Sequence, residues 1–184
     1  MAGAFELAGD DAEMTAEALA MARETALSLG GRLRFMRAAW GDGSVAMDGA
    51  ELLALAAGLP TGRRTRLLFD GVSPARPFSA HAVRLLLNLL LVAVESLAGE
   101  GLVSALGASD GDLLITLTGP RAAWPPGFVG QLADPGTALK AARQAEARTL
   151  QGPLAALIAH DAGVSVRMLL GASAAAPPLL IRLP

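Results

Sequence analysis

The sequence predicts an α+β fold, in which a helical hairpin precedes a two-layer sandwich of helices packed on a mixed β-sheet. Two observations support this prediction. A coiled-coil-like apolar pattern runs through the first 40 residues, and short helix and strand patterns separated by turns follow from Ser44. We therefore expect a helical-hairpin segment over residues 1–43 and a second domain over residues 44–184. A chain of 184 residues is long enough for one domain and a smaller appended element.

The first long helix is expected to begin after the capping residues Asp10 and Asp11 and to end at Trp40, before a glycine-rich turn. Phe5 and Leu7 are typical of the end of a preceding helix, so this segment contains the second half of a hairpin. Apolar residues at alternating spacings of three and four predict a narrow seam for helix–helix packing. The predicted seam consists of Leu19, Ala22, Ala26, Leu29, Leu33, Met36 and Trp40.

The second domain begins with a short helix that Asp48 can cap and that extends to about Ala57. Residues 63–70 alternate arginine and threonine with leucine and phenylalanine, a pattern typical of a half-buried strand. Ser79 can cap a strongly apolar helix over residues 80–98. The remaining expected elements are strands over 102–107 and 113–118 joined by a hairpin turn, a polar helix from about 137, an apolar helix over 150–161, and strands over 164–170 and 179–183.

Composition excludes several classes of function. The chain is 53% hydrophobic, but its most apolar stretch, residues 85–94, is far shorter than the roughly 20 residues of a bilayer-spanning helix, so we expect no membrane partner. No basic region precedes an apolar run at the N-terminus, so no signal peptide is expected. The absence of cysteine excludes thiolate metal sites and fits a cytoplasmic protein. Dispersed arginines and a net charge of −2 do not favour nucleic acid as a partner.

One motif on the apolar helix resembles a known family. The segment Asn88-Leu-Leu-Leu-Val-Ala-Val-Glu95 precedes a Gly-Glu-Gly turn and the expected hairpin. It resembles the N-box of histidine-kinase catalytic domains, the GHKL ATPases, whose pattern is Asn-Leu-x-x-Asn-Ala-x-Lys/Arg. The closing Leu180-Ile-Arg-Leu-Pro184 is similar to the last strand of those domains. The resemblance implies an ATPase-shaped fold over about residues 63–184.

Three positions depart from this family's ATP site. In the family, the second asparagine of the N-box ligates magnesium, but Val92 stands there, and Glu95 occupies the basic position. Thr118 lies near the place of the adenine-binding aspartate, and residues 113–133 contain no acidic residue. Because magnesium requires oxygen ligands, which valine lacks, we expect no ATP, no metal and no other cofactor. A residual ATP-dependent kinase is the weaker alternative.

The whole chain resembles the bacterial histidine phosphotransferases of the ChpT type. Gly3-Ala-Phe-Glu-Leu-Ala8 is similar to their Asn-Gly-Leu-Glu-Leu-Leu segment, and Arg32-Leu-Arg-Phe-Met-Arg-Ala-Ala-Trp-Gly41 to their Arg-Leu-x-Phe-x-Arg-x-Ala-Phe-Gly signature. Gly119-Pro-Arg121 and Leu150-Gln-Gly-Pro153 match as well. The resemblance implies a homodimer that forms a four-helix bundle and relays phosphate between response-regulator receiver domains, with a hybrid histidine kinase as a further candidate partner.

The family's phosphoacceptor histidine, which is followed by aspartate on the first hairpin helix, would precede Met1, so no catalytic residue is expected in this sequence. Either the sequence lacks that helix or the protein is a degenerate member, and the packing needs of the seam favour the first reading. His160-Asp161 mimics the dyad, but a histidine at a helix C-terminus is explained by the helix dipole. For His81 we expect a neutral surface or packing role.

The expected docking surface for receiver domains lies on the second hairpin helix, level with the absent histidine. Antiparallel counting from the turn near Gly9 places that level at about Ser28, so the docking candidates are Leu27, Gly31, Arg34 and Phe35. Two adjacent glycines in a helix cost roughly 1 kcal/mol each relative to alanine, which close approach of another backbone would explain. The main alternative function is a non-catalytic dimeric scaffold that binds receivers or regulates a kinase.

Overall fold

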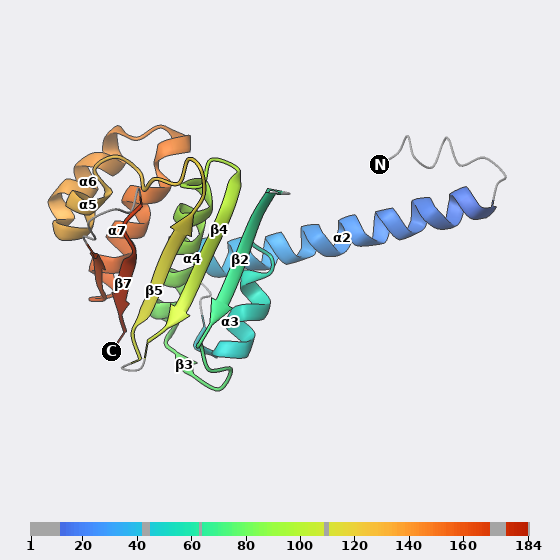
Figure 1. The fold of residues 1–184 in the computed structure, drawn as a ribbon, viewed down its shortest axis with the longest axis horizontal. Coiled ribbons are helices and arrows are strands. Elements are labelled where there is room, and N and C mark those ends of the chain that lie inside the picture. Colours follow the sequence, from blue (N-terminus) through green and yellow to red (C-terminus); the bar gives the residue numbers. More distant parts are fainter. Residues whose placement is uncertain (1–11, 42–44, 63, 109–110, 170–175, 184) are drawn as a thin grey trace.

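The computed structural model describes residues 12–41, 45–62, 64–108, 111–169 and 176–183. They form a two-layer body in which helices cover one face of a β-sheet, and one long helix projects from this body (Figure 1). This arrangement confirms the predicted α+β class and its sandwich. None of the described helices combines the length and the apolar character needed to cross a lipid bilayer.

The projecting helix is α2 (Ala12–Trp40), and it ends where the sequence predicted. The amide of Gly41 donates to the carbonyl oxygen of Arg37 at 2.8 Å, which closes the last turn. Only this end packs against the body: Phe35 and Ala39 are fully buried in the common core. The division between residues 43 and 44 stays a prediction, because the end of α2 contributes Phe35 and Ala39 to the core of the part that follows. Phe5, Leu7, Asp10 and Asp11 lie outside the described residues.

The next elements form a small layer beside α2. Helix α3 (Gly49–Ala56) starts from Asp48, whose carboxylate accepts from the amide of Glu51 at 2.9 Å, while Glu51 accepts from the Asp48 amide at 3.0 Å. This reciprocal capping confirms the predicted cap. Strands β1 (Met47–Asp48) and β3 (Pro77–Phe78) pair antiparallel, a contact that the sequence did not predict.

The main sheet has five strands and is mixed. In spatial order they are β2 (Arg64–Asp70), β4 (Glu100–Gly107), β5 (Leu113–Thr118), β7 (Leu179–Arg182) and β6 (Ser165–Met168). Strands β2 and β4 are parallel, because the chain crosses over between them through a helix, and the other neighbours are antiparallel. Alternate residues of β5 are buried, so one face of the sheet carries the core.

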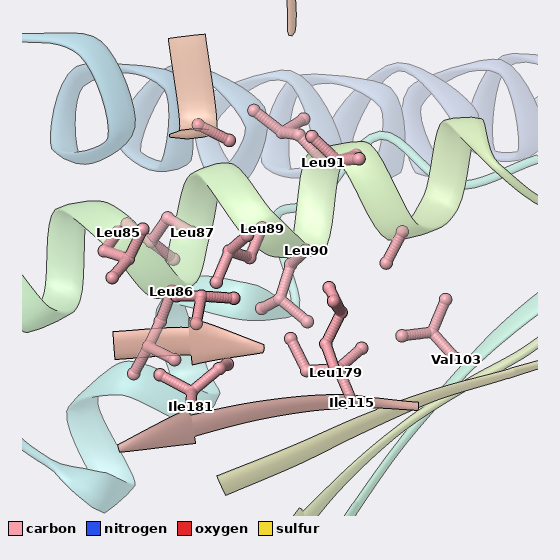
Figure 2. Packing of buried hydrophobic residues seen from close by; sticks show 14 of the residues in the cluster. Leu85, Leu86, Leu87, Leu89, Leu90, Leu91, Val103, Ile115, Leu179 and Ile181 are labelled. Carbon is pink, nitrogen blue, oxygen red and sulfur yellow. The ribbon is translucent and has the colours of Figure 1, made fainter. Parts of the chain in front are cut away.

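The helices after β2 are α4 (Ala80–Glu95), α5 (Phe128–Ala133), α6 (Pro135–Gln144), the 3₁₀ turn η1 (Ala147–Thr149) and α7 (Gln151–Asp161). Helix α4 is buried along most of its length, and Figure 2 shows its leucines gathered with Ile115, Leu179 and Ile181 of the sheet. It ends three residues earlier than predicted, because Ala98 and Gly99 adopt positive φ in the following turn. The short helix α5 was not predicted.

Candidate functional site

The N-box asparagine, Asn88, is fully buried where three helices meet. Its Nδ2 donates to the carbonyl oxygens of Ala39 in α2 and of Arg84 in α4, both at 2.8 Å. Its Oδ1 accepts from Trp40 Nε1 at 3.0 Å and from Gln151 Nε2 of α7 at 2.9 Å. Asn88 therefore joins the end of α2 to α4 and α7. This role was missed, although a single polar residue in an apolar helix is the signal for it.

The three positions that departed from the ATP-site pattern do not form one polar site in the structure. Val92 is fully buried in the core. Glu95 lies in the last turn of α4 and lines a cavity beside α7, whereas Thr118 ends β5 and lines a separate hollow on the sheet with Arg66 and Leu102. The fold therefore brings no set of magnesium or phosphate ligands together from these positions. Among the residues that the structure describes, no cluster of three or more His, Asp or Glu side chains could hold a metal ion.

The cavity beside Glu95 has a volume of about 600 Å³. We call it the α4–α7 cavity. It lies between the end of α4, the loop of residues 123–126, and helices α5, α6 and α7. Partial burial of the Glu95 carboxyl raises its pKa, because desolvation disfavours the charged form.

The predicted seam is largely open to solvent on α2. Leu19, Leu29, Leu33 and Trp40 are each more than half exposed, Ala26 is exposed, Ala22 is half-buried, and Met36 packs partly against the core. A stripe of exposed leucines and a tryptophan leaves apolar surface in water, which helix pairing would remove.

The predicted docking residues fall into two groups. Leu27 and Arg34 are exposed, and Gly31 is half-buried, because its backbone lies against that of Gly58. A Cβ at Gly31 would stand 3.5 Å from the Cα of Gly58, so the expected close approach of a backbone is present at this glycine. Phe35 is fully buried against the body. A side chain in the protein's own core cannot reach a receiver domain, so Phe35 is not a docking residue.

The two histidines occupy structural positions. His160 Nε2 lies 2.8 Å from the carbonyl oxygen of Gln131, so this ring ties α7 to α5. Its neighbour Asp161 is exposed. His81 is exposed in the first turn of α4. The exposure of His81 fits the expected surface role, whereas the contact of His160 with α5 is an addition to the expected interaction with the helix dipole.

The profile of the histidine phosphotransferase C-terminal domain matches residues 49–173, which is more than half of the chain. The chain belongs to the histidine phosphotransferase family. The matched segment begins at α3 and contains α4, the α4–α7 cavity and every strand of the main sheet except β7. The resemblance that the sequence motifs predicted is thereby confirmed.

Solved structures support the fold of this histidine phosphotransferase domain. A bacterial phosphotransferase solved at 1.7 Å matches with a TM-score of 0.65 and 21% identity, over 97% of this chain and 83% of that chain. The histidine kinase domain of the blue-light activated kinase from Erythrobacter litoralis has a TM-score of 0.45 and 12% identity, over 94% and 86%. The second likeness is too weak to argue from. Among curated protein sequences, none matches this chain.

Proposed function

We propose that this protein is the phosphotransfer component of a two-component phosphorelay, in which it carries phosphate between receiver domains in the cytoplasm. The exposed seam of α2 in a member of the histidine phosphotransferase family carries this proposal. A helix that leaves several large apolar side chains in water requires packing partners, and a bundle of two hairpins from two copies of the chain supplies them. The phosphoacceptor histidine belongs on the hairpin helix that faces this seam.

The chemistry of the relay needs one exposed imidazole. Its nitrogen attacks the aspartyl phosphate of a receiver, so that an N–P bond forms while the P–O bond to the aspartate breaks. The phosphoryl group then passes from the histidine to the aspartate of a second receiver domain. His160 is a poor candidate, because its Nε2 already lies in hydrogen-bonding distance of a backbone carbonyl at a helix end. Receivers are expected to dock on the exposed side of α2 at Leu27, Gly31 and Arg34.

The ATPase-like body serves as support in this proposal. Val92 lies in the core and Thr118 lies apart from Glu95, so neither contributes to a phosphate site. The buried contacts of Phe35 and Asn88 instead hold the base of α2 rigidly on α4. A rigid base fixes the position of the bundle relative to the docked receiver, which phosphoryl transfer between two side chains requires.

The proposal is tested with labelled phosphate on a purified receiver domain. Two proteins are compared: the 184-residue chain, and the product of its gene with any in-frame helix that precedes Met1. Transfer is expected only for a product that contains an upstream His-Asp helix, and His160→Ala should leave it unchanged. Transfer to the 184-residue chain that His160→Ala abolishes would refute the assigned site. Receiver binding without transfer by either protein would favour the scaffold.

A further inference from the structure

The walls of the α4–α7 cavity are apolar and held in place. Trp124, Pro125, Pro126 and Pro153 contribute to the lining. The Trp124 ring is fixed at both ends: its Nε1 donates to the carbonyl oxygen of Pro177 at 2.7 Å, and its ring packs on Phe128 with centroids 5.9 Å apart. The cavity is therefore preformed, as small-ligand sites usually are.

One polar group of the lining lacks a partner. Gln131 is only 6% exposed, and its Oε1 accepts no hydrogen bond from the residues that the structure describes. The backbone of Gln131 cannot shift freely, because its amide donates to Gly127 and its carbonyl oxygen lies 2.8 Å from His160 Nε2. A buried acceptor without a donor is unfavourable. If the Gln131 side chain turns this oxygen toward the cavity that it lines, a ligand with a hydrogen-bond donor would satisfy it.

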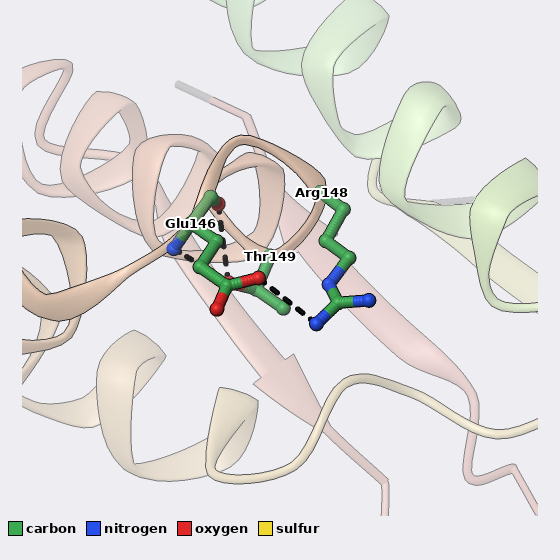
Figure 3. Close-up of polar contacts among 3 residues, drawn as sticks. All are labelled: Glu146, Arg148 and Thr149. Atoms are coloured by element: carbon green, nitrogen blue, oxygen red, sulfur yellow. Dashed lines mark hydrogen bonds and ion pairs between the residues drawn. The ribbon is translucent and has the colours of Figure 1, made fainter.

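The cavity lining has one side chain of each charge, Glu95 and Arg148. Glu95 is its one carboxylate, and within the described ranges it forms no ion pair. Arg148 also lines the cavity, but it pairs with Glu146 at 2.9 Å, beside the capping contacts of Thr149 (Figure 3). The raised pKa of Glu95 shows that its negative charge is poorly solvated, so a cation would be stabilising there.

We propose that the α4–α7 cavity binds a guanidinium or primary-amine cation carried on an apolar body. Glu95 supplies the counter-charge, Gln131 Oε1 accepts a hydrogen bond, and Trp124 with the prolines covers the apolar part. Nucleotides are disfavoured in this site, because their phosphates would lie beside the Glu95 carboxylate. This inference is independent of the phosphotransfer function, so either one can fail alone.

The first test compares two ligands of the same shape. Butylguanidinium is charged and butylurea is neutral, and each is titrated into the ¹⁵N-labelled chain while amide and indole NMR signals are followed. Butylguanidinium should shift the Trp124 indole and Gln131 signals saturably, with about tenfold weaker binding for butylurea. The Trp40 indole lies outside the cavity and should not respond. Equal binding of the two ligands would overturn the proposal, as would saturable binding of magnesium-ATP at the same signals.

Glu95→Gln tests the counter-charge with little risk to folding, because the change is isosteric and this carboxylate holds no ion pair in the described residues. We expect butylguanidinium binding to weaken about tenfold while butylurea binding stays unchanged. The matched control is Glu100→Gln, because Glu100 is a surface glutamate that pairs with Arg64 outside the cavity. This substitution should change the binding of neither ligand. Unchanged butylguanidinium binding by Glu95→Gln would exclude the site.

The same cation could belong to a free small molecule or to an arginine side chain of a docked protein. The peptide acetyl-Ala-Arg-Ala-amide, titrated in the same way, distinguishes them. Tighter binding of the peptide than of butylguanidinium assigns the site to a protein side chain, because backbone contacts then add to the cation. Equal or weaker binding assigns it to a free cation. Both assignments require that Glu95→Gln weakens the binding.

Discussion

Two faces of α2 near its C-terminal end differ sharply in environment, although both carry large apolar side chains. Leu33 is 53% exposed, whereas Phe35, two residues later, is completely buried. The difference arises from what lies opposite: Phe35 faces the body of the same chain, and Leu33 faces solvent on the other side of the helix. Apolar spacing therefore shows that a helix needs partners, but it does not show whether a given residue meets its own domain or another helix.

The largest expected effect separates these two faces. Phe35→Ala removes a ring from a packed core and should lower the free energy of unfolding by about 3–5 kcal/mol, whereas Leu33→Ala should change it by only about 0.5 kcal/mol in the monomer. Chemical denaturation at low protein concentration measures both. If Phe35→Ala does not fold, Phe35→Leu should still cost up to about 1.5 kcal/mol.

The two faces of α2 should also differ in their contribution to self-association of the chain. Leu33→Ala should weaken self-association measured by sedimentation, because mass action links subunit binding to apparent stability, and Phe35→Leu should leave it unchanged. A Leu33→Ala variant as unstable as Phe35→Ala in the dilute monomer would mean that the seam packs within one chain.

The second expected effect concerns the polar junction that holds α2 to the body. Asn88→Leu removes four hydrogen bonds and leaves the buried Gln151 amide with only its longer 3.4 Å contact to the backbone carbonyl oxygen of residue 88. The expected loss is about 3 kcal/mol, against about 1 kcal/mol for Trp40→Phe, which removes one bond of a half-exposed ring. The double variant should be less destabilised than the sum, since both changes remove the same Trp40 contact. Additive losses would show that the hydrogen bond between Trp40 and Asn88 contributes nothing to the free energy of unfolding.

Much of the body could be predicted from the sequence, because its elements have regular patterns. The alternation of β2 and β5 and the long apolar run of α4 identified the sheet and its central helix. Strands β1 and β3 were missed, since two residues are too few for a period. Helix α5 was missed within a proline- and glycine-rich loop.

The candidate site was harder to predict than the fold, because its contacts join distant segments. The motif singled out Asn88, but its partners Ala39 and Gln151 lie 49 and 63 residues away. Phe35 was assigned to the docking surface because it lies beside the seam in the sequence. Its side chain instead packs in the core together with Ala39, four residues later. Spacing alone cannot distinguish these adjacent apolar faces.

The third effect tests the close approach between the backbone of α2 at Gly31 and the turn after α3 at Gly58. A Cβ on Gly58 would overlap the carbonyl oxygen of Gly31, whereas a Cβ on Gly31 would make an ordinary 3.5 Å contact with Gly58. Gly58→Ala should therefore cost about 1–3 kcal/mol, and Gly31→Ala should stabilise α2 by up to about 1 kcal/mol. Thermal denaturation of both variants measures the asymmetry. Equal effects would mean that the two backbones do not lie this close in solution.

The smallest effect is electrostatic and lies far from α2, at the start of α6. Asp134 accepts from the hydroxyl of Thr137 at 2.6 Å and from its amide at 2.7 Å, and these bonds lower the pKa of the carboxyl. A lowered folded-state pKa means that the stabilisation is present above the ordinary value of about 3.9 and is lost as pH falls through the folded-state pKa. Asp134→Asn retains a capping side chain but cannot titrate.

The unfolding free energies of the wild type and Asp134→Asn, measured between neutral pH and pH 3, should therefore differ most at neutral pH. The difference should shrink only in the acidic range below about pH 4. Thr137→Val removes the hydroxyl bond, the largest cause of the shift, and should move this loss to higher pH. A difference that stays constant across the range would mean that the charge of Asp134 adds nothing to its cap. The stability of α6 would then depend on hydrogen-bond geometry alone.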